Sequence, residues 1–275
     1  MNSLPFKKCF GSIKPVIACV HLLPLPGSPL YGGSMGPVYR KALEEASLFT
    51  RWGVHGLIIE NFRDKPFFPG RLPAETVASL ASVGREIVKA VALPVGVNAL
   101  RNDGESAMAI AAAIEARFIR VNVHMNAVVS EQGILQGMSH QTLRLRASLK
   151  SEVLIFADVG VKHAAPLADR GLAIETRDLT ERGLVDTVIV SGEMTGEETN
   201  ASDVDVVRQH TPLPVLIGSG VTPENIDRVY EKADGFIIGS YFKKGGKGNH
   251  FVEEGRVKRF MEKIRDLRNK GGRRP

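Results

Sequence analysis

Polar residues stand at or near the ends of short apolar runs along the chain, and these residue types could transfer a proton on a bound metabolite. They are His21, Glu60, Asn61, Asn98, Arg120, Asn122, Asp158 and Ser191. Carboxylates and imidazoles exchange protons, Arg stabilises developing negative charge, and amides and hydroxyls orient a substrate. Any one of them could be an ordinary hydrogen-bonded core residue. Their repeated placement favours one shared site.

Glycine-rich turns follow two of the apolar runs. Gly218-Ser219-Gly220 comes after the seventh run and Gly239-Ser240 after the eighth, with Lys243 and Lys244 close behind. Glycines leave backbone N–H groups uncovered by side chains, so such turns can hold an anion. Glycine turns are common, and it is their position after the last two strands of a barrel that favours phosphate. We therefore predict phosphate binding at Gly218, Ser219, Gly220, Gly239 and Ser240.

Two further segments carry candidate catalytic residues. Arg101 lies in LRNDGESA, where Asp103 also suits the N-cap of a following helix. In ADVGVKHAAP, Asp158 and Lys162 share the period of an extended strand, and His163 is the next residue. An Asp near a Lys suits proton abstraction beside a carbonyl or stabilisation of the enolate, although a structural ion pair has the same sequence pattern.

From these patterns we assign catalytic and substrate-binding roles. The catalytic candidates are Glu60 and Asp158 as acid/base and Lys162 and Arg101 as stabilisers of negative charge; the substrate-binding candidates are His21, Asn98, Arg120, Asn122, His163 and Ser191.

Other chemistries are less well supported. Glu60, Asp158, His21 and His163 could bind a divalent ion, but no HExxH or paired CxxC pattern occurs, so we expect no metal and no cofactor. There is no Walker loop and no GxSxG elbow, and aromatic residues do not alternate with basic ones, which disfavours nucleic acid as a partner. Cys9 and Cys19 cannot form a disulfide framework, and Cys19 is expected to pack as a small core residue.

The apolar runs alternate with helical patterns, and this alternation predicts the fold. The runs are VIACVHL at 16, GLIIEN at 56, PVGVNAL at 94, FIRVNVH at 118, VLIFADV at 153, TVIVSG at 187, PVLIGSG at 214 and GFIIGS at 235. Helical spacing predicts helices over segments that include 37–52, 73–91, 104–115 and 222–233, the last with Thr222 as N-cap and Pro223 as its first residue. Eight strand and helix units close an α/β eight-stranded parallel (β/α)8 barrel, a TIM barrel.

An open doubly wound sheet is the alternative, but no GxGxxG follows the first run. In a barrel the carboxyl ends of the strands meet on one face, which would gather the candidate residues. We expect one domain over 1–275, with an N-terminal lead at 1–14 and a basic C-terminal helix and tail at 253–275. Two Pro- and Gly-rich loops, 22–36 and 62–73, are expected at the mouth, the first shaping it and the second acting as a lid or as an ordinary surface loop.

Charge is concentrated at the end of the chain. The net charge is +6, and residues 256–275 hold nine Lys/Arg and two Asp/Glu, so the rest of the chain is close to neutral. The tail is either a solvated helix end or an electrostatic contact to an acidic membrane surface. No apolar stretch approaches the ~20 residues that span a bilayer, and the N-terminus lacks a secretory pattern. We expect a cytoplasmic protein, with peripheral membrane attachment as the alternative, and a homo-oligomer by analogy with the fold class.

Several long motifs resemble the BtpA family. They are VHLLPLPGSPLYGGSM at 20–35, GLIIENFRDKPFF at 56–68, PVGVNALRND at 94–103, FIRVNV at 118–123, ADVGVKHAAPL at 157–167 and GSGVTPENI at 218–226, and the resemblance runs from about 14 to about 265. It implies a ribulose-phosphate-binding type of β/α barrel. It also implies two functions: a role in photosystem I biogenesis at a membrane, and an activity on a phosphorylated sugar.

The sequence thus predicts an enzyme acting on a phosphorylated sugar or similar small metabolite, by isomerase or aldol-type lyase chemistry taken from the fold class. A noncatalytic photosystem I biogenesis factor is the alternative.

Overall fold

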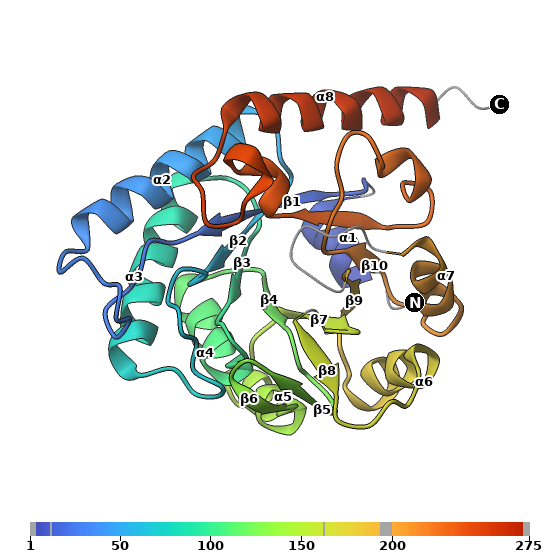
Figure 1. Cartoon of the computed structure of the whole chain (residues 1–275), viewed down its shortest axis with the longest axis horizontal. Helices are drawn as coiled ribbons and strands as arrows, with labels where there is room; N and C mark the ends of the chain where they lie inside the picture. The colour runs from blue at the N-terminus through green and yellow to red at the C-terminus, as the bar shows by residue number, and fades with distance from the viewer. Residues whose placement is uncertain (1–3, 12, 162, 193–199, 272–275) are drawn as a thin grey trace.

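The computed structural model describes residues 4–271 except 12, 162 and 193–199. Its main feature is a closed barrel of eight parallel strands in the order β1-β11-β10-β9-β7-β4-β3-β2 (Figure 1). The strands are β1 (Val16–His21), β2 (Gly56–Glu60), β3 (Val95–Asn98), β4 (Phe118–Val121), β7 (Leu154–Val159), β9 (Thr187–Val190), β10 (Val215–Ile217) and β11 (Gly235–Ile238). The eight-stranded barrel and the positions of all eight apolar runs are confirmed.

Helices surround the barrel and cover the outward face of the strands. They are α2 (Gly36–Arg51), α3 (Ala74–Ala90), α4 (Gly104–Ile114), α5 (Ser139–Ser148), α6 (Leu172–Arg177) with the π-helical η1 (Asp178–Arg182), α7 (Ala201–Gln209) and α8 (Glu254–Gly271). The helices predicted over 37–52, 73–91 and 104–115 are confirmed by α2, α3 and α4. Their buried residues recur at three-to-four spacing because one stripe of each helix packs on the barrel.

The helix predicted over 222–233 is wrong. This segment holds only the single 3₁₀ turn η2 (Ile226–Arg228), so Pro223 does not begin a helix. Side chains hold the turn instead: the Thr222 N–H donates to Asn225 Oδ1 at 2.8 Å, and Asn225 Nδ2 donates to the Gly220 carbonyl at 2.8 Å. Two more short turns, η3 (Ser240–Phe242) and η4 (Lys244–Gly246), follow β11.

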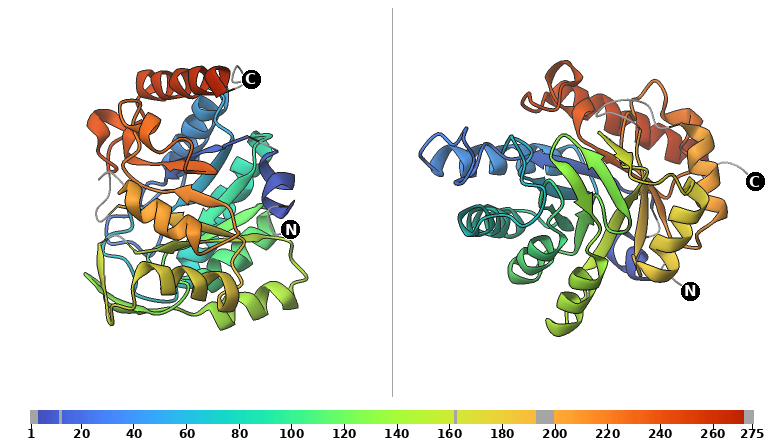
Figure 2. Two further views of the ribbon diagram at one scale, coloured as in Figure 1. Left: turned by 90° about the vertical axis from the view of Figure 1, so that its right-hand side faces the viewer. Right: turned by 60° about the horizontal axis from the view of Figure 1, so that its bottom comes forward.

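The amino end of the barrel is closed by α1 (Leu4–Phe10), a helix within the segment that the sequence analysis named only as an N-terminal lead. Phe6 and Phe10 are buried and lie 5.0 Å apart between ring centroids. They pack against the inward-facing Phe118 and Phe156, which are themselves stacked at 4.6 Å. Figure 2 shows α1 at the end of the barrel opposite to the loops that follow the strands. Aromatic side chains therefore form the floor of the barrel.

A small antiparallel sheet was not predicted. Its order is β6-β5-β8, from β5 (Ala127–Ser130), β6 (Gly133–Gln136) and β8 (Ala164–Pro166). It is built from the loops after β4 and β7 and lies at the same end of the barrel as the other carboxyl-end loops (Figure 2).

Helix α8 packs along the barrel rather than projecting from it. Val257, Phe260, Met261 and Ile264 are buried, while Arg259 and Lys263 pair with Glu224 and Asp227 on the loop after β10. Within the part of the chain that the structure describes, no helix is both long and apolar enough to span a bilayer.

Candidate functional site

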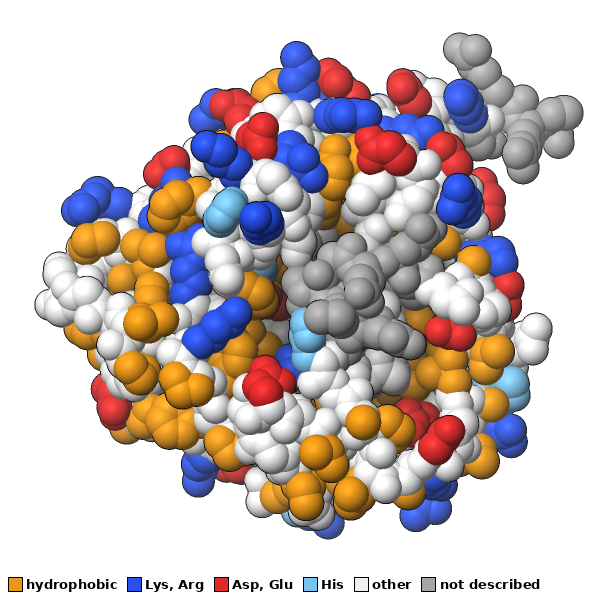
Figure 3. Space-filling view, viewed as in Figure 1, with side chains coloured by type: hydrophobic (Ala, Val, Ile, Leu, Met, Phe, Trp, Pro, Cys, Tyr) orange, Lys and Arg blue, Asp and Glu red, His pale blue; other side chains and the backbone are white. Residues whose placement is uncertain are grey.

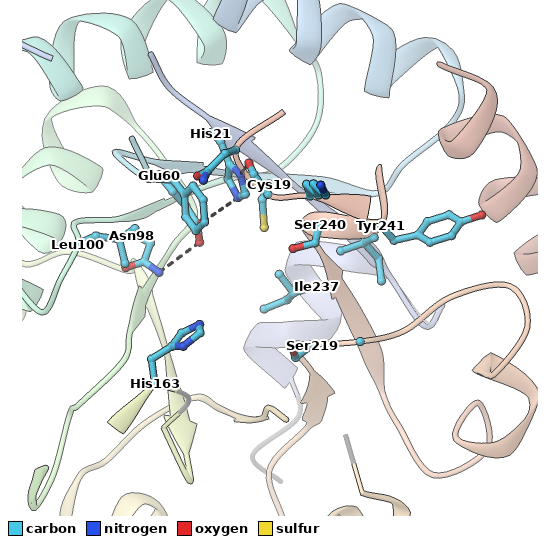
Figure 4. A pocket seen from close by; sticks show the side chains of 18 of the residues that line it. Cys19, His21, Glu60, Asn98, Leu100, His163, Ser219, Ile237, Ser240 and Tyr241 are labelled. Atoms are coloured by element: carbon cyan, nitrogen blue, oxygen red, sulfur yellow. Dashed lines mark hydrogen bonds and ion pairs between the residues drawn. The ribbon is translucent and has the colours of Figure 1, made fainter. Parts of the chain in front are cut away.

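Strand register brings three predicted site residues together. His21, Glu60 and Asn98 end β1, β2 and β3, and each is the Cα partner of the next. Because alternate side chains of a strand point inward, all three are buried at the top of the barrel interior. His21 Nε2 lies 3.2 Å from Glu60 Oε2, and Asn98 Nδ2 donates to Glu60 Oε1 at 3.2 Å (Figure 4).

The His21 ring is fixed on both sides. Its Nδ1 lies 2.9 Å from the Gly248 carbonyl, which only accepts hydrogen bonds, so Nδ1 carries a proton and Nε2 faces Glu60. The Phe62 ring stacks on the imidazole at 4.1 Å between centroids. Burial, followed by the charge of Lys243, lowers the pKa of His21. The ring is therefore held in one orientation, with the Gly248 carbonyl accepting from Nδ1 and with Nε2 close enough to Glu60 to share a proton.

Asp158 is surrounded by hydrogen-bond donors. Arg120 reaches it with two bonds, from Nε at 2.9 Å and from a terminal nitrogen at 2.7 Å, and Asn122 Nδ2 and Ser191 Oγ donate at 3.1 Å and 2.9 Å. Its side chain is only 1% exposed. These bonds fix Asp158 and the Arg120 side chain relative to each other. Arg120 in turn lies 3.7 Å from Glu60 Oε1, so it links the two carboxylates.

Next to β1, the turns after β10 and β11 contribute three glycines to the lining of the mouth. A Cβ at Gly218 would lie 2.6 Å from Ile189 Cγ2 and 2.9 Å from Ser191 Oγ, so no side chain fits there. A Cβ at Gly239 would lie 3.5 Å from both Cys19 Sγ and His21 Nε2, which is ordinary contact but would fill the space in front of them. Gly220 has φ +66°, the left-handed region that favours glycine. The glycines thus keep this side of the mouth open.

The His21–Glu60 pair and the glycine turns line one cavity of about 640 Å³. The space-filling view of this end of the barrel has a hollow near its centre (Figure 3). The predicted residues that line the cavity are His21, Glu60, Asn98, Arg101, Arg120, Asn122, His163, Gly218, Ser219, Gly220, Gly239 and Ser240. Asp158 and Ser191 line a neighbouring cavity of about 570 Å³ that also includes Asn122 and His163. Lys162 lies outside the described residues.

Lys243 follows closely on the glycine turn after β11, but it does not line the cavity. It is fully buried, its Nζ pairs with Glu45 Oε2 at 3.0 Å, and it donates to the Cys19 carbonyl at 3.0 Å. Lys243 thereby ties the loop after β11 to β1 and α2.

The two Pro- and Gly-rich loops have different roles. Phe62, Lys65 and Phe67 of the 62–73 loop line the cavity. Among the described residues, none from the 22–36 loop lines it. The earlier loop instead supports the later one, because the Leu25 N–H donates to Asp64 Oδ1 at 2.8 Å. The expectation that 22–36 shapes the mouth directly is therefore corrected. Asn61 is also structural, with its Oδ1 accepting from the Leu100 N–H at 2.7 Å.

Two residues of the loop after β3 have separate roles. Asp103 is the expected N-cap of α4, with its side chain accepting from the Ser106 N–H. Arg101 is 5% exposed and lines the cavity, where burial lowers its pKa. The Oδ1 atom of Asn122, a residue that lines the same cavity, is buried and has no hydrogen-bond partner among the described residues. A ligand hydroxyl could donate to it.

Sequence reasoning missed several lining residues. They are Cys19, Phe62, Lys65, Glu131, Lys247, Gly248 and Arg256. Most lie in loops or at the start of α8, where no periodic pattern marks them. Cys19 could have been found, because it stands two residues before His21 on one strand and must therefore face the same side.

A family model described as the BtpA family matches residues 12–266. The chain belongs to the BtpA family. Among relatives of this BtpA-family chain, an uncharacterized protein of Thermococcus kodakarensis is 42% identical over 93% of this chain and 97% of its own length. The photosystem I biogenesis protein BtpA of Synechocystis is 41% identical over 92% of this chain and 88% of its own.

Solved structures similar to the BtpA-family barrel show its fold alone, because their sequence identities are low. Tryptophan synthase of Mycobacterium tuberculosis has a TM-score of 0.61 at 13% identity, covering 96% of this chain and 98% of that one. Phosphoribosyl anthranilate isomerase of Thermus thermophilus has a TM-score of 0.57 at 11% identity, covering 92% and 99%. Thiamine phosphate pyrophosphorylase of Pyrococcus furiosus has a TM-score of 0.58 at 10% identity, covering 93% and 97%.

Proposed function

We propose that this BtpA-family chain is an enzyme that binds a small phosphorylated metabolite, such as a sugar phosphate, and moves a proton beside its carbonyl group. The observation that carries the proposal is the arrangement of one cavity. The His21–Glu60 pair and the glycine turns after β10 and β11 line the same cavity, and Gly239 lies next to His21. Isomerisation is the simplest such reaction, and aldol-type cleavage is the close alternative.

The phosphate would lie against the glycine turns. Gly218, Gly220 and Gly239 present backbone without side chains, and Lys247 and Arg256 line the same cavity. Backbone amides and cations together favour a dianion. Two proteins of similar fold, phosphoribosyl anthranilate isomerase and thiamine phosphate pyrophosphorylase, are named after phosphate-containing compounds. This supports the proposal at the level of the fold.

The reacting carbon would lie near Glu60. In the isomerase reaction, Glu60 takes a proton from the hydroxyl-bearing carbon next to the carbonyl and returns it to the former carbonyl carbon, while the hydroxyl proton moves to the former carbonyl oxygen, so no other reactant is needed. Arg101, which is buried in the cavity wall, would stabilise the enolate oxygen, and Asn122 would accept a hydrogen bond from a substrate hydroxyl. Asn98 and His21 hold the carboxylate in position. Asp158 and Ser191 would act by holding Arg120 and Asn122.

Thermal unfolding with a library of phosphorylated metabolites tests this proposal. A ligand at about 100 times its Kd stabilises the folded state by about 2.7 kcal/mol, and for a chain of this size each kcal/mol raises Tm by about 2–4 °C. We expect at least one sugar phosphate to raise Tm by roughly 5–10 °C and its dephosphorylated form to have little effect.

Gly239→Ala sharpens the test. Its added methyl group meets only ordinary contacts, so the variant should fold, but the group fills the space in front of His21 Nε2 and should weaken the ligand-induced shift. Gly32→Ala is the matched control, because a Cβ there has no neighbour within 4 Å. Equal shifts for phosphorylated and dephosphorylated compounds, or none at millimolar concentration, would refute phosphate binding.

A noncatalytic assembly factor is the second candidate, favoured by the 41% identity to the Synechocystis photosystem I biogenesis protein. In this case the basic C-terminus would hold the chain peripherally on an anionic membrane. Much of the charge of α8 is already engaged, since Arg259 and Lys263 pair with acidic residues of the same chain and Arg268 bonds the Lys14 carbonyl.

Vesicle binding separates the two candidates. An assembly factor held by its tail should bind anionic vesicles in low salt, and removal of 272–275, which carries two Arg, should weaken that binding without disturbing α8. Unchanged binding after this truncation would exclude residues 272–275 as the tether. Cytoplasmic location and homo-oligomer formation remain part of the proposal for either candidate.

A further inference from the structure

We propose that Cys19, His21 and Glu60 form a binding site for one thiophilic divalent metal ion of the zinc class. One donor atom from each residue, the Cys19 sulfur, a His21 ring nitrogen and a Glu60 carboxylate oxygen, lies within 4.8 Å of the others. Cys19 and His21 are two residues apart on β1, and Glu60 is the register partner of His21 on β2. The barrel itself, rather than a loop, therefore sets their spacing.

In the neutral His21 ring, Nε2 carries no proton and can bind a cation. Its Nδ1 must donate to the Gly248 carbonyl at 2.9 Å, so in the neutral ring Nε2 carries a lone pair. That lone pair faces Glu60 Oε2 at 3.2 Å. Two acceptors this close need a proton or a metal ion between them. Nitrogen and oxygen ligands with bonds of ~2.0–2.1 Å to a tetrahedral zinc ion lie about 3.3 Å apart, close to the observed separation.

The surrounding hydrogen bonds orient these ligands as in known zinc sites. A ligating His normally donates its other ring N–H to a carbonyl or carboxylate, and Gly248 fills this role. Asn98 Nδ2 bonds Glu60 Oε1, and Arg120 lies 3.7 Å from the same oxygen, so Oε2 is the oxygen directed to His21. On the backbone side, the Lys243 ammonium bonds the Cys19 carbonyl at 3.0 Å and fixes this part of β1.

The fourth coordination position would open on the cavity. Gly239 faces the cluster, and a Cβ there would lie 3.5 Å from Cys19 Sγ and from His21 Nε2. The missing side chain leaves space for a water or a substrate oxygen. Three protein ligands with one open position are typical of catalytic zinc sites, and the thiolate and imidazole favour zinc over magnesium. The sequence analysis expected no metal because no HExxH or paired CxxC pattern occurs, and its candidate ligands did not include Cys19.

The ion would take the place of the proton shared by His21 and Glu60. In the metal-free chain Glu60 would act as the base of the step proposed above, whereas in the loaded chain the ion would polarise a substrate oxygen as a Lewis acid. Metal binding does not depend on a phosphorylated substrate. Either proposal can therefore fail without the other.

Cobalt substitution tests the site on the full-length, chelator-treated protein. We expect one Co²⁺ per chain, with a sulfur-to-metal charge-transfer band in the near ultraviolet and the intense visible bands of a four-coordinate ion. Zn²⁺ should displace Co²⁺, and millimolar Mg²⁺ should not. Cys19→Ala should remove the charge-transfer band and weaken Co²⁺ binding by at least 100-fold.

Cys9→Ala is the matched control, because Cys9 is the chain's other cysteine and lies on α1 at the closed end of the barrel. It should keep the band. Glu60→Gln provides a second ligand variant should Cys19→Ala fail to fold, and it should weaken Co²⁺ binding while retaining sulfur coordination. The proposal is overturned if wild-type protein lacks the sulfur band, if Cys9→Ala removes it, or if both ligand variants bind Co²⁺ as tightly as wild type. If wild-type protein lacks the cobalt signal but still shows the phosphate-dependent Tm shift, the metal site is rejected and the proposed function is not.

Discussion

The two ends of the barrel are built from the same strands but contain opposite kinds of side chain. At the amino end, Phe118 and Phe156 of β4 and β7 pack against Phe6 and Phe10 of α1. Two residues further along the same strands, Arg120 and Asp158 form a buried ion pair at the cavity. The inward-facing positions thus change from aromatic to charged within one step of the strand period.

This difference separates stability from ligand binding. The floor is apolar and closed, so its side chains contribute through burial and packing. The mouth buries charges that must be paired, and it keeps Gly239 where a larger residue would fill the space in front of His21. Substitutions at the floor should therefore change the free energy of unfolding, and substitutions at the mouth should change what the protein binds.

The largest expected effect is at the floor. Phe10→Ala removes a ring that contacts Phe6 and Phe118 and should lower the free energy of unfolding by about 3–5 kcal/mol. Denaturant titration measures this loss. Leu4→Ala on the same helix is the control and should cost far less, because Leu4 is 60% exposed. A similar loss for both variants would mean that α1 does not close the barrel in solution.

A smaller effect is expected at the mouth. Gly218→Ala places a methyl group 2.6 Å from Ile189 Cγ2, and such overpacking typically costs 1–3 kcal/mol. Gly239→Ala meets no contact shorter than 3.5 Å and should be nearly neutral in denaturant. Urea unfolding of the two variants shows whether packing requires glycine at 218, while glycine at 239 is needed only to leave space for a ligand. Equal stabilities would contradict this division.

The last effect is small near neutral pH and concerns the closed end of the barrel. His55 Nδ1 accepts from the Val16 N–H at 3.0 Å, and burial followed by the charge of Arg268 lowers the pKa of His55 to about 4. Between the ordinary pKa of about 6.5 and this value, the unfolded chain binds a proton that the folded chain does not. Stability should therefore fall as the pH is lowered from about 6.5 towards 4.

His55→Gln checks the source of that dependence. The Gln side chain does not titrate, so its curve of unfolding free energy against pH should be flatter than that of wild type over this window. His140→Gln, at an exposed position on α5, serves as the control. If the wild-type and His55→Gln curves run parallel, His55 is not responsible.

The barrel could be predicted because its strands are short β-branched runs at regular intervals, and the strand period then placed His21, Glu60 and Asn98 at one end. The partners of these residues could not be predicted. Gly248 and Phe62 reach His21 from loops, and loop conformation depends on tertiary contacts such as the bond from Leu25 to Asp64. The segment 222–233 has helical spacing, but side-chain bonds from Asn225 favour a turn. Helix α1 has only seven residues, too few for a clear helical period.

The position of α1 has a practical consequence for ligand discovery. The described chain begins at Leu4, on the face of the barrel opposite to the cavity. A sensor surface that captures the protein through a flexible N-terminal tether would leave the cavity facing bulk solution. Capture of this kind suits screening of fragments and metabolites, because the sensor surface would not block access to the cavity.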